Sequence, residues 1–154
     1  MSCGGWKIGW ATGPVDLVDA VEGAKNWLSY ASGAPLQPAI AHALDHEQDF
    51  PRRLRAELQS KRDVLFEGLG ALDMDVRVPE GTYFVTSDVR RYGWADGREF
   101  CLSLPQRAGV VAIPSQVFYD DQDEGRHLVR WAFCKTEDVI REGITRLSRA
   151  NLYR

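Results

Sequence analysis

The 154-residue sequence lacks any long hydrophobic run, and a membrane-spanning helix, which needs about 18 or more apolar residues in a row, is therefore not expected. It also lacks an excess of positive charge, with a formal net charge of −3 and a pI of about 5.6. Binding to nucleic acid or to an anionic membrane depends on a concentrated basic surface. We therefore expect neither partner and a protein of ordinary soluble globular composition.

Cysteine is scarce. The three cysteines, Cys3, Cys101 and Cys134, are far apart in the sequence, and no CxxC pattern occurs. An odd number at wide spacing disfavours a disulfide framework and a zinc site, and it predicts free thiols in a reducing compartment. Because no signal-peptide core follows Met1, we expect a cytoplasmic protein.

The sequence contains no GxSxG, Walker or GxGxxG motif. His42 and His46 have the i, i+4 spacing of a metal-binding pair on a helix. No third ligand follows at a sensible spacing, and the HExxH pattern is absent, so we do not expect a metal site.

Hydrophobic periodicity predicts one strand, then helices, then several strands mixed with two helices. This order indicates an α/β to α+β fold. The expected strands cover residues 6–11, 74–78, 82–86, 110–113 and 128–134. The expected helices cover residues 17–31, 39–44, 49–70, 96–109 and 136–147, where the fourth ends either at Pro105 or at Gly109. Val139, Ile140, Ile144 and Leu147 of the last helix are expected to face the core.

Arg130 is the most informative single residue, because it interrupts the apolar strand over residues 128–134, LVRWAFC. Alternation places it on one face with Ala132, while Val129 and Trp131 point to the other face. A guanidinium cannot lose its proton, so a buried Arg130 needs an anion. That anion is either an acidic side chain of the protein or the carboxylate of a ligand, whose geometry matches the guanidinium fork.

Lys7 interrupts a segment rich in aromatic residues and glycine, residues 5–10, GWKIGW. Glycines permit close approach of a ligand, and an ammonium group is a suitable contact for a phosphate. The alternative is a solvated lysine that protects an edge strand from aggregation. A second aromatic segment, residues 79–84, PEGTYF, predicts a hairpin with core aromatics.

Four segments together resemble class I/II aminotransferases of fold type I, which depend on pyridoxal phosphate. The matching segments, in the family's order, are residues 5–14 (GWKIGWATGP), 79–84 (PEGTYF), 109–114 (GVVAIP) and 128–135 (LVRWAFCK), and residues 34–39 (APLQPA) are also similar to these enzymes. The resemblance covers nearly the whole chain. Within the family it is similar to the branch of kynurenine/glutamine and N-succinyldiaminopimelate aminotransferases.

The resemblance implies roles for two residues. Lys7 matches the basic residue that binds the phosphate of pyridoxal phosphate, and Arg130 matches the arginine that binds the α-carboxylate of the substrate. It also implies amino acid and 2-oxo acid substrates and a homodimer in the complete enzyme. Both roles agree with the chemistry expected from the residues alone, a point charge for phosphate and a planar fork for carboxylate.

The resemblance further implies that the family's Schiff-base lysine lies upstream of Met1, with residues 2–4 as the end of the segment that follows it. None of the four lysines has a matching context, so no catalytic residue is assigned within the chain. Expected domains are a large-domain remnant (1–33), a connecting segment (34–48) and the small C-terminal domain (49–154). Two alternatives are a non-catalytic folded fragment and part of a carbon–sulfur β-lyase.

Overall fold

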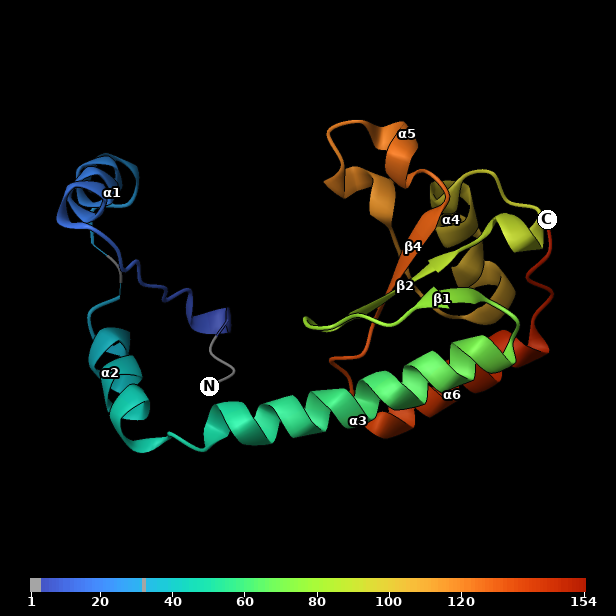
Figure 1. Cartoon of the computed structure of the whole chain (residues 1–154), viewed down its shortest axis with the longest axis horizontal. Helices are drawn as coiled ribbons and strands as arrows, with labels where there is room; N and C mark the ends of the chain where they lie inside the picture. The colour runs from blue at the N-terminus through green and yellow to red at the C-terminus, as the bar shows by residue number, and fades with distance from the viewer. Residues whose placement is uncertain (1–3, 32) are drawn as a thin grey trace. The chain divides into compact units, whose positions relative to one another are not determined.

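The computed structural model describes residues 4–31 and 33–154, and the expectations for Ser2 and Cys3 lie outside these residues. The chain divides into two compact units, residues 1–54 and 55–154, with the division inside one long helix (Figure 1). The predicted boundary between a large-domain remnant and a small domain remains a prediction.

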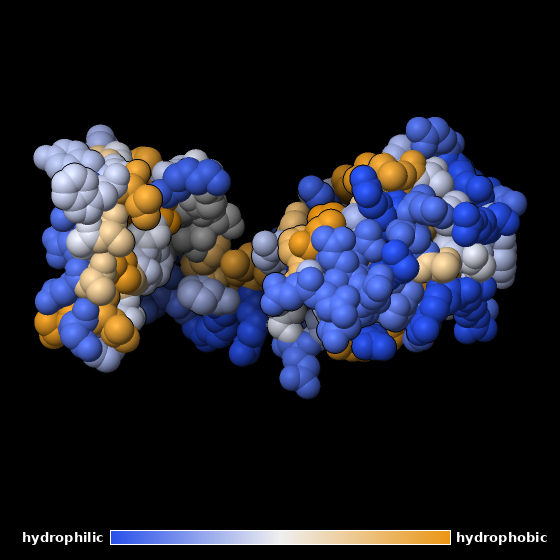
Figure 2. All heavy atoms as spheres, turned by 90° about the horizontal axis from the view of Figure 1, so that it is seen from above, coloured by the Kyte–Doolittle hydropathy of each residue, from blue (hydrophilic) through white to orange (hydrophobic). Residues whose placement is uncertain are grey.

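The first unit contains the 3-10 helix η1 (Gly4–Trp6) and two α-helices, α1 (Val15–Leu28) and α2 (Leu36–His46). Among its described residues, Ile40 of α2 is buried, whereas α1 has no buried residue. Hydrophobic atoms lie on the surface of this unit, at the left of Figure 2. The large exposed apolar side chains of α1 are Val15, Leu17, Val21, Trp27 and Leu28.

The predicted strand over residues 6–11 is wrong, because the described sheet contains only residues between 75 and 132. Lys7 has a left-handed backbone with a φ of 55°, and residues 8–12 have no regular structure. A strand needs a neighbour to satisfy its backbone N–H and C=O groups, and no described segment pairs with this one.

The second unit contains an antiparallel sheet of four strands in the order β1-β2-β4-β3. The strands are β1 (Asp75–Arg77), β2 (Phe84–Asp88), β3 (Ile113–Pro114) and β4 (Leu128–Ala132). Thr86 lies opposite Arg130 in the β2–β4 pair, and Ile113 lies opposite Arg130 in the β3–β4 pair. Because every described strand pair is antiparallel, the fold of this unit is α+β.

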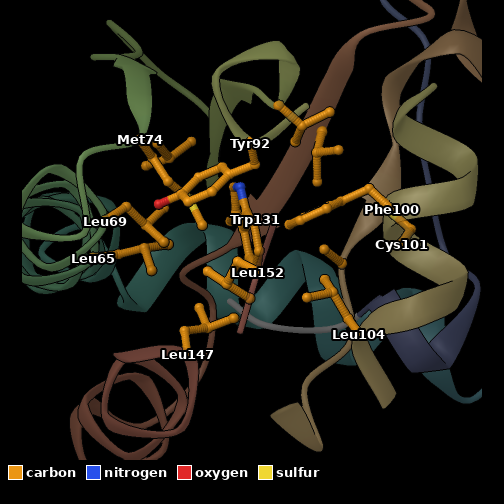
Figure 3. Close-up of a cluster of buried hydrophobic side chains, with 14 of the residues drawn as sticks. Leu65, Leu69, Met74, Tyr92, Phe100, Cys101, Leu104, Trp131, Leu147 and Leu152 are labelled. Atoms are coloured by element: carbon orange, nitrogen blue, oxygen red, sulfur yellow. The ribbon is translucent and has the colours of Figure 1, made fainter. Parts of the chain in front are cut away.

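Three long helices cover one face of this sheet (Figure 1): α3 (Phe50–Ala71), α4 (Gly97–Ala108) and α6 (Glu137–Arg149). Figure 3 shows side chains from these helices pointing toward Trp131 of β4. The indole Nε1 of Trp131 donates a hydrogen bond of 2.8 Å to the hydroxyl of Ser87. This bond satisfies the polar atom of a large buried side chain at the centre of the core.

Short helical segments connect the main elements: η2 (Arg90–Tyr92), η3 (Ser115–Phe118) and α5 (Gln122–Gly125). The predicted helix over residues 96–109 continues through Pro105 and ends at Gly109, whose φ is 63°. Val139 is 56% exposed, so its predicted place in the core is wrong, whereas Ile140 and Leu147 are buried. None of the described helices combines the length and the apolar character needed to cross a lipid bilayer.

Candidate functional site

Arg130 lies on the face of the sheet that the three long helices do not cover. Val129 and Trp131 of β4 are buried in the core, whereas the alternate residues Arg130 and Ala132 are half-buried. The predicted alternation of β4 is therefore confirmed over residues 129–132, while Leu128 at the start of the strand is buried although it shares the face of Arg130. This open face presents the guanidinium beside the partner strand residues Phe84 and Thr86, which are also half-buried.

Two phenylalanines contact the Arg130 guanidinium. Its Cζ lies 4.1 Å from the ring centroid of Phe84 and 4.5 Å from that of Phe118. Phe84 belongs to β2, and Phe118 ends η3, directly after β3, so the two rings come from elements on opposite sides of β4. Attraction between a cation and an aromatic face stabilises this arrangement.

No carboxylate pairs with Arg130 in the part of the chain that the structure describes. The ion pairs found among residues 4–31 and 33–154 do not involve it. Asp88, on the same strand face as Thr86, instead accepts hydrogen bonds from Arg90. The interpretation of Arg130 as half of an internal ion pair thus has no support, and its N–H donors have no carboxylate partner among these residues.

Asp88, the last residue of β2, differs from Arg130 because its charge has partners within the protein. Burial acts to raise the pKa of Asp88, but hydrogen bonds from the side chain and backbone of Arg90, together with the attraction of Arg90 and His127, outweigh burial. The pKa of Asp88 is therefore below its ordinary value. Oδ2 lies 2.6 Å from Nη2 of Arg90 and 3.6 Å from Nε2 of His127.

The predicted hairpin around residues 79–84 is confirmed, since β1 and β2 pair across it. Its aromatics are not in the core, however: Tyr83 is exposed, and half-buried Phe84 contacts Arg130. Sequence alternation could have given the face of Phe84 on its own strand, but only the pairing of β2 with β4 places it beside Arg130. Nothing in the sequence pointed to Phe118, which lies on a short turn without periodicity.

Lys7 lies in the first unit, where its side chain is exposed. Its predicted contact with a phosphate remains a prediction. His42 and His46 stack with ring centroids 4.0 Å apart, and Nδ1 of His46 lies 2.8 Å from the carbonyl oxygen of His42. The described residues contain no group of three or more His, Cys, Asp or Glu arranged to hold a metal ion.

The four lysines show which contacts with pyridoxal phosphate this chain could provide. Nζ of Lys25 donates to the carbonyl oxygen of Tyr30 at 2.7 Å, and Lys61 pairs with Glu57 one helical turn away. Lys7 and Lys135 are exposed. No described lysine has the sequence context of the family's Schiff-base lysine. The described residues therefore provide a candidate contact for the cofactor phosphate but no assigned amine for its aldehyde.

Comparison with known proteins gives a consistent result. The family model "Aminotransferase class I and II" matches residues 1–147. A relative from Mycobacterium tuberculosis, described as a probable N-succinyldiaminopimelate aminotransferase, is 46% identical over 96% of this chain and 39% of its own length. Kynurenine–oxoglutarate transaminase of Dictyostelium discoideum is 30% identical over 90% of this chain and 36% of its own length.

Solved structures agree with these sequence relatives. N-succinyldiaminopimelate aminotransferase from Mycobacterium tuberculosis matches 95% of this chain and 38% of that chain, with a TM-score of 0.89 and 49% identity. A methionine aminotransferase from Escherichia coli matches 94% of this chain and 38% of that chain, with a TM-score of 0.85 and 32% identity. The chain thus has part of the fold-type I architecture and spans about two fifths of the length of these relatives.

Proposed function

The chain belongs to the class I and II aminotransferase family, and from this premise we propose that it forms the substrate-carboxylate side of an enzyme that transfers amino groups from amino acids to 2-oxo acids. Arg130 binds the α-carboxylate in this proposal. The observation that carries it is the position of Arg130 on the open sheet face, between two phenylalanines and without an internal carboxylate partner among the described residues.

The role of Arg130 follows from its chemistry. A guanidinium fork makes two parallel hydrogen bonds to a carboxylate, which fixes the orientation of the substrate as well as its position. The half-buried setting strengthens these bonds relative to bulk water. An arginine on a regular strand also holds its backbone position more rigidly than one on a loop.

Lys7 binds the phosphate of pyridoxal phosphate in this proposal. Pyridoxal phosphate, when bound, supplies the electron sink for removal of the α-proton. The exposed ammonium of Lys7 is a suitable point charge for a phosphate. The amine that carries the cofactor belongs to family sequence that this chain does not match, so we propose that the chain alone does not catalyse the reaction.

The substrates and setting are further parts of the proposal. The names of the similar proteins make N-succinyldiaminopimelate, kynurenine and methionine the first amino donors to assay. We place the complete enzyme in the cytoplasm as a homodimer, consistent with free Cys101 and Cys134.

A fusion tests the proposal directly. The part of the Mycobacterium tuberculosis relative that this chain does not match is joined to residues 1–154, and amino transfer to 2-oxoglutarate is assayed with each donor. We expect activity from the fusion and none from the 154-residue chain. Lys7→Ala in the fusion should weaken pyridoxal phosphate binding, whereas Lys61→Ala, which removes a lysine already paired with Glu57, should not.

The alternative of a non-catalytic fragment predicts a different outcome. The intact relative is the positive control. If the fusion folds and binds the cofactor but transfers no amino group while the intact relative does, the proposal is contradicted and that alternative is favoured. Addition of pyridoxal phosphate to the 154-residue chain provides a second readout. A specific borohydride-reducible adduct on one lysine of this chain would contradict the assignment of the amine to the unmatched sequence.

A further inference from the structure

The phenylalanines around Arg130 are arranged around its charge rather than in a hydrophobic core. Phe118 is 61% exposed, yet its ring centroid lies 4.5 Å from Cζ of Arg130. Phe84 approaches the same atom to 4.1 Å from the strand on the other side of β4. We call Phe84 and Phe118 the phenylalanine pair. An exposed phenyl group contributes little to folding, so its contact with a cation is the feature to explain.

The pair restricts both the side chain and its surroundings. Arginine has many rotamers, and two ring contacts from opposite sides of β4 select the ones that keep the guanidinium on the open face. The face of a phenyl ring carries negative electrostatic potential, so it attracts the guanidinium and repels a carboxylate. An incoming carboxylate is thereby directed to the N–H donors, where it makes two parallel hydrogen bonds.

Neighbouring residues support the segments that carry the two rings. The Tyr83 ring lies 4.6 Å from that of Phe84, centroid to centroid. The turn that carries Phe118 packs against α5 at Gly125, where a side chain would collide with Tyr119 and Gln116. Both members of the pair therefore have a defined support outside the main core.

We propose that the phenylalanine pair positions Arg130 for the substrate carboxylate, so that Phe84 and Phe118 are positioning residues of the carboxylate site. This inference rests on the proposed function of Arg130 and adds the two residues that make it effective. Removal of one ring should weaken carboxylate binding without removing the guanidinium itself. Loss of an exposed cation–π contact corresponds to a change of about two- to fivefold in the dissociation constant.

The test uses nuclear magnetic resonance on the full 154-residue chain, titrated with acetate. The Nε–Hε signal of Arg130 is assigned by its loss in Arg130→Lys, and its shift gives the Kd for acetate. We expect Phe118→Leu to raise that Kd about two- to fivefold. Phe118→Tyr keeps an aromatic ring beside the guanidinium and should leave the Kd at the wild-type value. Val117→Ala, at an exposed neighbour on the same turn, is the matched control and should leave the Kd unchanged.

A second readout comes from the active fusion. There Phe118→Leu should raise KM for the amino acid more than it lowers kcat, which a general loss of structure would not do. Phe84→Leu is a second test provided that its backbone spectrum is native. If it is not, Phe118→Leu decides the test, because Phe118 is exposed and its replacement should not disturb the fold.

The outcomes separate the two proposals. If Arg130 responds to acetate and Phe118→Leu leaves both Kd and KM unchanged, the positioning role is wrong and the carboxylate site stands. If the Arg130 signal of the wild-type chain responds no more than those of the exposed arginines, the carboxylate site itself is wrong, and the positioning role with it.

Discussion

Gly125 packs so closely against Tyr119 that a β-carbon on Gly125 would lie 2.5 Å from Cδ2 of the tyrosine ring and 3.0 Å from Cα of Gln116. Tyr119 directly follows η3, the turn that carries Phe118. The absence of a side chain at Gly125 is therefore what lets α5 support the turn beside Arg130.

Gly125→Ala is expected to lower the free energy of unfolding by about 1–3 kcal/mol, as overpacking typically does. The collision involves backbone at Gln116, which cannot move aside as a flexible side chain would. Gly143→Ala is the matched control, because Gly143 is also helical and a β-carbon there meets open space. It should stabilise the protein by up to about 1 kcal/mol. Equal effects of both variants in urea unfolding would contradict this account.

Asp88→Asn is expected to destabilise the second unit at pH 7, because the carboxylate accepts several hydrogen bonds from Arg90. The folded pKa of Asp88 is lowered, so its contribution is fully present above the unfolded pKa of about 3.9 and is lost as pH falls through the folded value. The stability difference between wild type and variant should therefore shrink below about pH 4.

The control for this pH series is Asp73→Asn, which removes an exposed ion pair with Arg91. Such pairs contribute about 1 kcal/mol or less, and asparagine tolerates the left-handed backbone at this position. Denaturant unfolding from pH 3 to 8 measures both variants. A stability difference for Asp88→Asn that is constant across this range would show that its charge makes no contribution.

The two cysteines of the second unit should differ in reactivity. Burial, with the nearby Asp96 carboxylate as a smaller cause, raises the pKa of the Cys101 thiol to about 12, whereas Cys134 is exposed. Only the thiolate is a nucleophile, so at pH 8 iodoacetamide should modify Cys134 and leave Cys101 intact until urea unfolds the chain. Peptide mass spectrometry of a Cys3→Ser variant measures this, and Cys134→Ser is the control. Rapid labelling of native Cys101 would contradict its position in the core.

Hydrogen exchange should distinguish the two units. Backbone amides of α1, which has no buried residue, should exchange much faster than those of β4 and of the core-facing turns of α6. The reason is that α1 has little tertiary packing to stabilise it, and an isolated helix of this length is marginal in water. Equal protection of α1 and β4 would contradict this expectation.

Much of the second unit could be predicted from the sequence, because its signals are local. Asp96 precedes α4 and accepts backbone N–H bonds from Arg98 and Glu99, as its residue type suggests. The alternation of β4 correctly separated Arg130 from Val129 and Trp131. These features depend on residues a few positions apart, so the sequence pattern predicts them.

The features that could not be predicted depend on distant partners. The pattern around Lys7 resembles a strand, but a strand forms only beside another, and no described segment pairs with it. Phe118 contacts Arg130 because a short turn folds back over the sheet, which no periodicity indicates. Val139 has apolar character but is exposed, since it lies on a side of α6 that points away from the core, whereas its neighbour Ile140 is buried.

Arg130→Ala in the active fusion tests the central claim, that Arg130 binds the substrate carboxylate, most directly. kcat/KM is measured for an amino acid donor and for its α-carboxamide, which has no carboxylate. We predict that the variant lowers kcat/KM roughly 30-fold or more for the acid, the effect of removing one partner of a desolvated charge pair, and changes the low value for the amide little. Arg149→Ala, at an exposed arginine of α6, is the control and should match wild type. Equal losses for acid and amide, or no loss for the acid, would contradict the claim.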